Sequence, residues 1–180
     1  MTSPRTIEQT ADLVGRQRYA ELTLFAALGD RVLRATEPGV MVALAGAAEG
    51  HAWRARVLEE LLPVSLGLPG VEEATKSAGP QFDSAVARLT SESDDLRLAE
   101  ALAKVLYPAM LGAYRAHLVS CSEISDPPVM LALRRVIADL ESQSDELYAV
   151  VGADEGPPRG SAADVLELLD RLDGPFGRID

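Results

Sequence analysis

Apolar residues recur every three or four positions along four stretches of the chain, which is the spacing of one buried face of an α-helix. The stretches cover roughly residues 7–35, 38–62, 93–119 and 127–151. Ala and Leu dominate them, and aromatic residues make up only 4% of the chain, which favours packed helices over a β-sheet. The pattern therefore predicts an all-α fold built on four long helices.

Prolines and capping residues mark the expected ends of these helices. Pro38 ends the first and suits the first turn of the second, because the residue before a proline disfavours the helical conformation. Ser91 or Ser93 is the expected cap of the third helix, and Pro108 is expected to kink it. Asp126 precedes a proline and is the expected cap of the fourth helix.

The connections between the four helices differ in length. The first two helices are joined by a few residues and must be antiparallel, as must the last two, whereas about thirty residues separate the second from the third. A short helix near residues 81–89 is expected in this long connection, with Phe82, Val86 and Leu89 on its buried side. The connection is long enough to cross the bundle, so the third helix is expected to run parallel to the second.

The last thirty residues differ in composition from the rest. Residues 152–160 are rich in Gly, Pro and charge, and a short amphipathic helix is expected over residues 161–172. Its apolar stripe consists of Val165, Leu166, Leu168, Leu169 and Leu172. Because such a short helix does not persist alone in water, it is expected to dock on the bundle, on a second copy in a homodimer, or on a protein partner. We therefore divide the chain into a bundle, residues 1–151, and a linker with a C-terminal helix, residues 152–180.

Two ionisable residues interrupt the apolar stripes of the first two helices. Glu21 belongs to the series Val14, Glu21, Phe25, Leu28 and Val32, and His51 to the series Leu44, Ala48, His51, Ala55, Leu58 and Leu62. A polar group in the core is costly unless it finds a hydrogen-bonding partner or a metal ion. The two residues are therefore either a pair that satisfies itself, a metal site, or a polar spot that binds a ligand.

The segments Tyr19-Ala20-Glu21-Leu22 and Gly50-His51-Ala52-Trp53-Arg54 resemble the ferritin-like superfamily, and within it the actinobacterial tRNA-hydroxylase-like branch. The resemblance covers residues 10–151 and implies a ferritin-like four-helix bundle with a long connection between its second and third helices. It also implies a centre of two iron ions that activates dioxygen. Glu21 matches the carboxylate ligand of the first helix and His51 the histidine of the second, while Asp139 stands where the fourth helix supplies a carboxylate.

The remaining ligands implied by this resemblance are missing from the sequence. Ala48 stands where the second helix should supply a glutamate, and Ser142 where the fourth should supply a histidine. No Asp or Glu occurs between Ala101 and Ser122, so the third helix has no mid-bundle carboxylate. A di-iron centre needs more oxygen and nitrogen donors than this. We therefore expect no metal and no other cofactor, with Glu21, His51 and Asp139 as vestigial ligands.

Tyr107, Tyr114 and His117 lie near one another on the third helix. They either fill the core with their polar atoms satisfied or line a small pocket there. Gly46 and Gly50, one turn apart in a run of small residues, indicate a close helix approach or space for a ligand.

Arginines gather at one end of the bundle if its helices run up, down, down and up. They are Arg16, Arg18, Arg54, Arg56, Arg115, Arg134 and Arg135. Solvated helix faces explain such a set, but it also predicts a patch for an anion or a partner. A further interpretation is that one arginine replaces the charge of a metal beside Glu21.

Charge and compartment signals limit the classes of partner. The net charge of −11 disfavours a nucleic-acid partner, because phosphate contacts come mainly from Lys and Arg. The N-terminus lacks the apolar core of a signal peptide, and the longest apolar run, residues 39–48, is about half a membrane span, so we expect no membrane partner. The single cysteine, Cys121, cannot form an internal disulfide. These features predict a cytoplasmic protein.

The sequence thus predicts a ferritin-like bundle that has lost its di-iron centre and is a non-catalytic binding or accessory protein. The alternative is a di-iron or mononuclear metal-dependent oxygenase or hydroxylase of the tRNA-hydroxylase-like type, with iron as the expected metal. Its metal site would combine Glu21, His51 and Asp139 with either Glu49 or Glu141.

Overall fold

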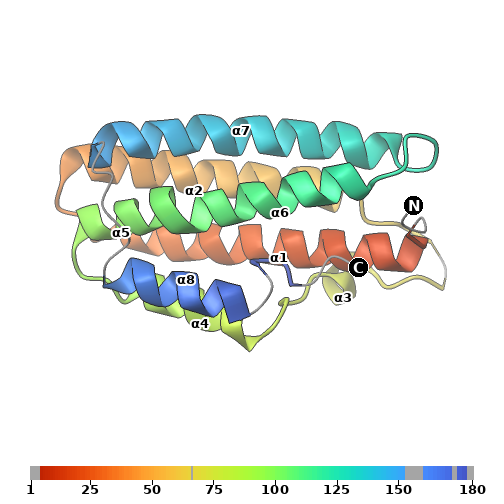
Figure 1. Cartoon of the computed structure of the whole chain (residues 1–180), viewed down its shortest axis with the longest axis horizontal. Helices are drawn as coiled ribbons and strands as arrows, with labels where there is room; N and C mark the ends of the chain where they lie inside the picture. The colour runs from red at the N-terminus through yellow and green to blue at the C-terminus, as the bar shows by residue number, and fades with distance from the viewer. Residues whose placement is uncertain (1–4, 66, 153–159, 172–173, 178–180) are drawn as a thin grey trace.

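The computed structural model describes residues 5–65, 67–152, 160–171 and 174–177. Every regular element within these ranges is a helix, which confirms the predicted all-α class (Figure 1). The elements are α1 (Ile7–Val32), α2 (Pro38–Glu59), α3 (Val71–Ala74), α4 (Pro80–Thr90), α5 (Asp95–Ala101), the π-helix η1 (Leu102–Leu106), α6 (Tyr107–Ser120), α7 (Pro127–Val151) and α8 (Ser161–Arg171). No helix in the described ranges is both long enough and apolar enough to cross a membrane.

Four long helical rods lie side by side in Figure 1: α1, α2, the continuous rod α5–η1–α6, and α7. α1 and α7 run in one direction, and α2 and α6 run in the other. The segment between α2 and α5, which contains α3 and α4, crosses the bundle and lets α2 and α6 run parallel. This order of directions is the one that the connection lengths predict.

The helix ends deviate from the predictions by a few residues. α1 begins at Ile7 with a Thr6 capping box, and it ends at Val32 rather than near Ala35. The cap of α5 is Asp94, whose side chain accepts hydrogen bonds from the next turn, and neither Ser91 nor Ser93. A one-turn helix, α3, was not predicted.

A π-helical turn directly precedes Pro108, the residue expected to kink this helix. Because proline lacks an N–H, it leaves the carbonyl group of Lys104 without its normal helical donor. The turn just before it, Leu102–Leu106, is widened, and the N–H of Tyr107 donates to Leu102, five residues back.

The buried stripe of α1 includes Leu24 where Phe25 was predicted. Leu24 has no exposed surface, whereas the side chain of Phe25 is 43% exposed. The six predicted positions of the second stripe are buried, the last of them, Leu62, just beyond the end of α2, and Phe82, Val86 and Leu89 form the inner side of α4.

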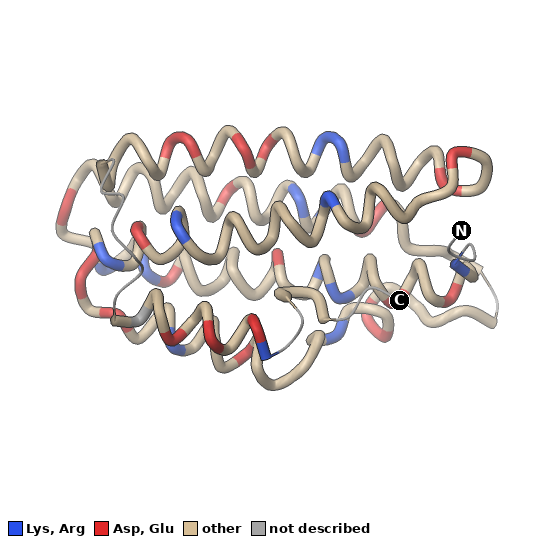
Figure 2. Tube along the Cα trace, in the orientation of Figure 1, with Lys and Arg blue, Asp and Glu red and all other residues tan. Residues whose placement is uncertain are grey.

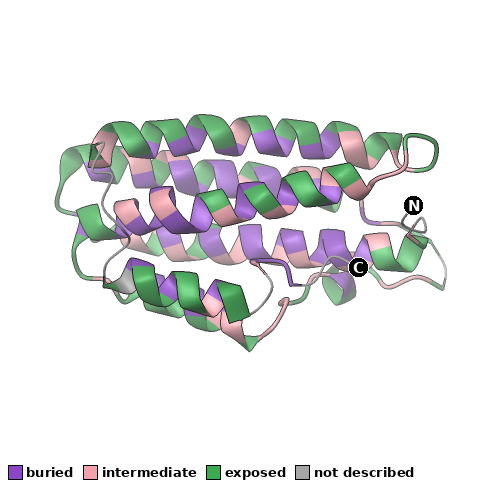
Figure 3. Cartoon of the chain, viewed as in Figure 1, coloured by how far each residue is buried: buried purple, intermediate pink, exposed green. Residues whose placement is uncertain are grey.

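The C-terminal helix α8 packs against α4 of the same chain (Figure 3). Ala162, Val165 and Leu169 are buried in the common core, while Leu166 is 40% exposed. The ion pair Arg88–Asp164 joins the two helices at the surface. Leu172 and the linker residues 153–159 lie outside the described residues. Of the three docking modes considered from the sequence, the structure contains the one within the chain.

Candidate functional site

The predicted pair Glu21 and His51 meets in the centre of the bundle. Antiparallel α1 and α2 face each other there, and neither side chain has any exposed surface. His51 Nδ1 lies 2.5 Å from Glu21 Oε2. The polar interruptions of the two apolar stripes therefore satisfy each other, as the first interpretation of these residues requires.

Arg54 joins Glu21 and His51 in this site and is also fully buried. It lies one turn beyond His51 on α2, and its Nε donates to Glu21 Oε2 over 3.0 Å. Its Nη1 donates to a carboxylate oxygen of Asp139 and, over 2.9 Å, to Gln143 Oε1, both on α7. The guanidinium group thus bridges a carboxylate on α1 and another on α7, which is a bridging role that a metal ion plays between carboxylates.

Two tyrosines of the rod η1–α6 supply hydroxyl groups to the same network. Tyr114 donates to Glu21 Oε1 over 2.5 Å, and the Tyr107 hydroxyl lies 3.1 Å from His51 Nε2. Both rings are fully buried. The two tyrosines fill the core with their hydroxyls bonded.

The contacts of His51 place a proton on its Nδ1. Glu21 can only accept, so Nδ1 carries a proton and donates to it, and in the neutral imidazole Nε2 accepts from the Tyr107 hydroxyl. Arg54 Nη2 also lies 2.9 Å from Nδ1, but a nitrogen that donates to Glu21 cannot accept from a guanidinium. Because a tyrosine hydroxyl can also accept, the contacts with Glu21 and Tyr107 suit both protonation states, and the lowered pKa of His51 favours the neutral imidazole.

The charges of the network agree with this assignment. Burial lowers the pKa of His51, and although the Glu21 charge opposes this, the pKa stays below the usual value. Burial alone would raise the pKa of Glu21, but Arg54 and His51 outweigh it and the pKa is lowered. Burial likewise opposes the charge of Arg54, yet Glu21 raises its pKa above the usual value. The core therefore holds a Glu21–Arg54 ion pair beside a neutral histidine.

These residues do not fit a di-iron centre. The two carboxylates that could bind iron, Glu21 and Asp139, are already hydrogen-bonded to the Arg54 cation. Of the other proposed ligands, Glu49 is exposed, and Glu141 is paired with Arg115 at the surface. In the described ranges no three His, Cys, Asp or Glu residues form a cluster suited to a metal ion.

Gln143 explains the small residues of α2. A Cβ atom placed on Gly50 would lie 1.6 Å from Gln143 Nε2, so only glycine leaves room for this side chain. Gln143 Nε2 donates to the carbonyl group of Gly46 over 3.0 Å, while its Oε1 accepts from Arg54. The close approach predicted for this run is thus between α2 and a side chain of α7.

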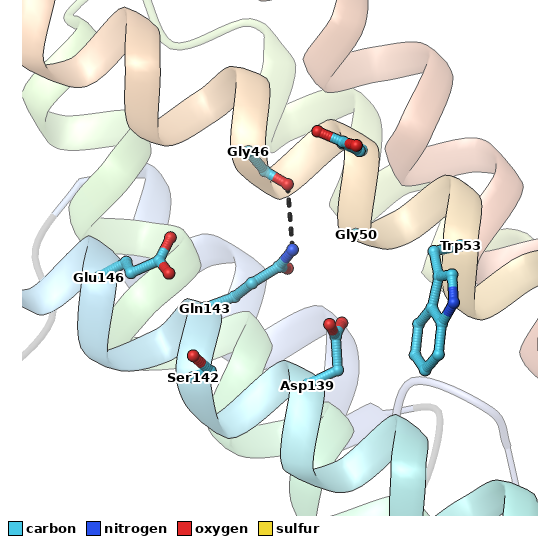
Figure 4. Close-up of a pocket in the computed structure, with 8 residues that line it drawn as sticks. Gly46, Gly50, Trp53, Asp139, Ser142, Gln143 and Glu146 are labelled. Atoms are coloured by element: carbon cyan, nitrogen blue, oxygen red, sulfur yellow. Dashed lines mark hydrogen bonds between the residues drawn. The ribbon is translucent and has the colours of Figure 1, made fainter.

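An open groove of about 350 Å³ lies directly outside this contact, between α2 and α7 (Figure 4). Its lining is Gly46, Glu49, Gly50 and Trp53 from α2, and Asp139, Ser142, Gln143 and Glu146 from α7. Three carboxylates and one indole ring therefore face a hollow whose floor residues, Asp139 and Gln143, are held by the buried Arg54.

The seven arginines do not form one surface patch. Figure 2 shows the basic positions of α1, α2, α6 and α7 at a similar level along the bundle. Their side chains point in different directions, however, because Arg54 is in the core and Arg18 is buried against Glu59 and Thr75. The prediction of an anion or partner patch is wrong for these two residues. The interpretation of an arginine beside Glu21 agrees with the position of Arg54.

His117 is separate from the central network. It is 1% exposed and hydrogen-bonded through Nδ1 to the side chain of Gln17, 3.0 Å away. Its main-chain carbonyl accepts from the Cys121 thiol. Burial lowers the pKa of His117 to about 4, with a contribution from Arg5. His117 is thus a satisfied core residue and does not share a pocket with Tyr107 and Tyr114.

We expect acid to destabilise the protein partly through His117. In the folded chain its pKa is about 4, whereas the unfolded chain has the usual value of 6.5. Between these values the unfolded state binds more protons, so the free energy of unfolding falls as the pH falls from 6.5 towards 4, by about 3 kcal/mol in total. Urea unfolding of the wild type and of His117→Gln at pH 7.5 and 4.5 measures this, and the variant should lose clearly less stability. An equal loss in both proteins would contradict the assignment.

Sequence reasoning missed Gln143, and it named Arg54 only as one of seven arginines of a possible patch. Arg54 follows His51 by three residues, and Gln143 follows Asp139 by four, so both lie on the same helix face as a residue that was singled out.

No family model, curated protein or solved structure matches this chain.

Proposed function

We propose that this chain is a ferritin-like bundle in which the Arg54 guanidinium takes the place of the metal centre, and that it is a non-catalytic binding protein. The observation that carries the proposal is the position of Arg54, fully buried between Glu21 and Asp139. The order of helix directions and the pair of Glu21 with His51 support the ferritin-like part. The fixed cation supplies charge compensation without redox chemistry, which favours binding over oxygenation.

The groove between α2 and α7 is the ligand site in this proposal. Its wall is the indole ring of Trp53, 41% exposed, and its rim carries the carboxylates of Glu49 and Glu146. An aromatic face next to carboxylates attracts an organic cation through the ring quadrupole and through ion pairing. We therefore propose an organic amine as the ligand class.

The floor of the groove is held in position before any ligand arrives. Asp139 and Gln143 are both hydrogen-bonded to Arg54, and Gln143 is also tied to Gly46. A fixed floor lowers the entropy lost on binding, which favours affinity. The arginine core and the groove are thus two parts of one arrangement.

Titration with a polyamine tests the proposed function. Trp53 is the only tryptophan, so intrinsic fluorescence reports on the groove directly. With spermidine we expect a saturable fluorescence change with a Kd below about 1 mM, equivalent to about −4 kcal/mol. The affinity should fall as salt is raised, because the rim carboxylates are exposed.

Matched variants distinguish binding in the groove from non-specific attraction of a cation to the acidic protein surface. Glu146→Gln removes a carboxylate of the rim, whereas Asp145→Asn removes the neighbouring exposed carboxylate, which does not line the groove. We expect the first to weaken spermidine binding by about threefold to tenfold, as for a pair worth about 1 kcal/mol, and the second to change it little. Equal effects of the two variants, or no saturation, would refute the groove as the ligand site.

A further inference from the structure

The C-terminal turn, residues 174–177, inserts an aromatic ring into the bundle at a place other than the groove. Phe176 has no exposed surface, and its ring packs on that of Tyr114 with centroids 4.7 Å apart. The turn lies between α1 and the α3–α4 connection, because a Cβ atom on Gly177 would approach both Arg16 and Ala78. An aromatic side chain from the chain's end therefore occupies a hole in the side of the bundle.

The hole offers a polar contact beside the apolar one. Arg16 on α1 donates from Nη1 to the main-chain carbonyl of Phe176 over 2.8 Å. We call the space that Phe176 fills, between the Tyr114 ring and Arg16, the seat of Phe176. The seat thus holds a ring together with an acceptor oxygen a few bonds away from it. This combination is a feature of an aromatic acid as well as of a phenylalanine residue.

The hydrogen bonds of Arg16 are incomplete with the turn in place. Its Nη2 pairs with Asp12 over 3.1 Å, but its Nε is buried without a partner. A buried donor without an acceptor costs about 1–3 kcal/mol. The carbonyl of Phe176 is also neutral, and a carboxylate forms a hydrogen bond with a guanidinium that is roughly twice as strong. The turn therefore leaves part of the hydrogen-bonding capacity of Arg16 unused.

Local contacts hold the rest of the turn. The N–H of Gly174 donates to Leu169 in α8, and the N–H of Gly177 donates to Gly174. Both glycines have positive φ angles, of 95° and 69°, which ordinary side chains rarely adopt. A turn displaced from the seat exposes the Gly177 N–H to water, so hydrogen exchange of this amide reports the displacement.

We propose that the seat of Phe176 is a second ligand site, for an aromatic ring that carries a carboxylate, and that the chain's own turn occupies it until such a ligand displaces it. The ring of the ligand replaces that of Phe176 on Tyr114, and its carboxylate replaces the carbonyl at Arg16. Displacement also brings a ligand next to Tyr114, whose hydroxyl is bonded to Glu21. The seat is therefore an autoinhibited site that borders the central network.

Calorimetric titration with 3-phenylpropionate tests this site, because the compound combines the ring of phenylalanine with a carboxylate. In Phe176→Ala the competing ring is gone, so we expect at least about tenfold tighter binding than in the wild type. Arg16→Gln in the same background should abolish this gain. The neutral analogue 3-phenylpropan-1-ol should bind at least about tenfold more weakly than the acid, because it lacks the charged contact.

The opposite results are equally clear. If Phe176→Ala binds the acid and the alcohol equally well, the seat is only an apolar cavity, and if it binds neither, Phe176 is only core packing. If Phe176→Ala does not fold, Phe176→Leu takes its place in the titration, and the intact protein gives an independent test. In the intact protein, 3-phenylpropionate must speed hydrogen exchange of the Gly177 amide, and unchanged exchange overturns the proposal. The acid should leave Trp53 fluorescence unchanged, so this test and that of the groove fail independently.

Discussion

Replacing Arg54 by methionine is expected to destabilise the protein by about 3–5 kcal/mol at pH 7, which is the usual cost of breaking a buried ion pair by removing one partner. Methionine keeps most of the volume but leaves the carboxylate of Glu21 buried without its cation. Urea unfolding measures the loss. A second change, Glu21→Gln, should restore part of the stability in this background, because it removes the uncompensated charge.

The matched control for Arg54 is Arg56, which lies on the same helix but is exposed. Arg56→Met should change the free energy of unfolding by no more than about 0.5 kcal/mol. The pH dependence gives a second check. Without Arg54 the pKa of Glu21 must rise, so the loss of stability caused by Arg54→Met should shrink as the pH falls. A loss below about 1 kcal/mol at pH 7 would mean that the guanidinium does not compensate Glu21.

The second large effect is expected for the pair Glu21 and His51. Either single change, Glu21→Gln or His51→Leu, leaves a buried polar group without its partner and should cost about 1–3 kcal/mol or more. The two side chains are 2.5 Å apart, so the double variant should be more stable than the sum of the single losses implies. A double-mutant cycle in urea measures this coupling.

The control for this cycle pairs Glu21→Gln with His117→Gln, because His117 is bonded to Gln17 and is not part of the network. That coupling should be close to zero. A coupling of Glu21 with His51 that is no larger than this control would contradict the contact between them.

The sequence could predict the centre of the site because the evidence is periodic. Glu21 and His51 interrupt apolar stripes, and the antiparallel pairing of the first two helices brings the stripes together. The same rule could not separate Leu24 from Phe25. Leu24 is three residues after Glu21 and four before Leu28, while Phe25 is four after and three before. Both spacings suit the stripe, and only tertiary packing selects Leu24.

Other parts of the structure depend on contacts that no local pattern encodes. Arg54 looks like an ordinary surface arginine until Asp139 and Glu21 are placed on either side of it. Phe176 follows a stretch of Gly and Pro without any periodicity, so nothing in the sequence indicates that it enters the core. Long charged side chains and tail residues are buried only when distant segments provide their partners.

The metal content of the purified protein tests the central claim most directly. The proposal is that the Arg54 cation takes the place of the metal centre of ferritin-like bundles, so the 180-residue chain, expressed aerobically with added iron, should contain far less than one iron ion per chain by elemental analysis. It should also show no absorption band of an oxo-bridged iron pair. About two iron ions per chain together with such a band would contradict the account and favour the oxygenase alternative.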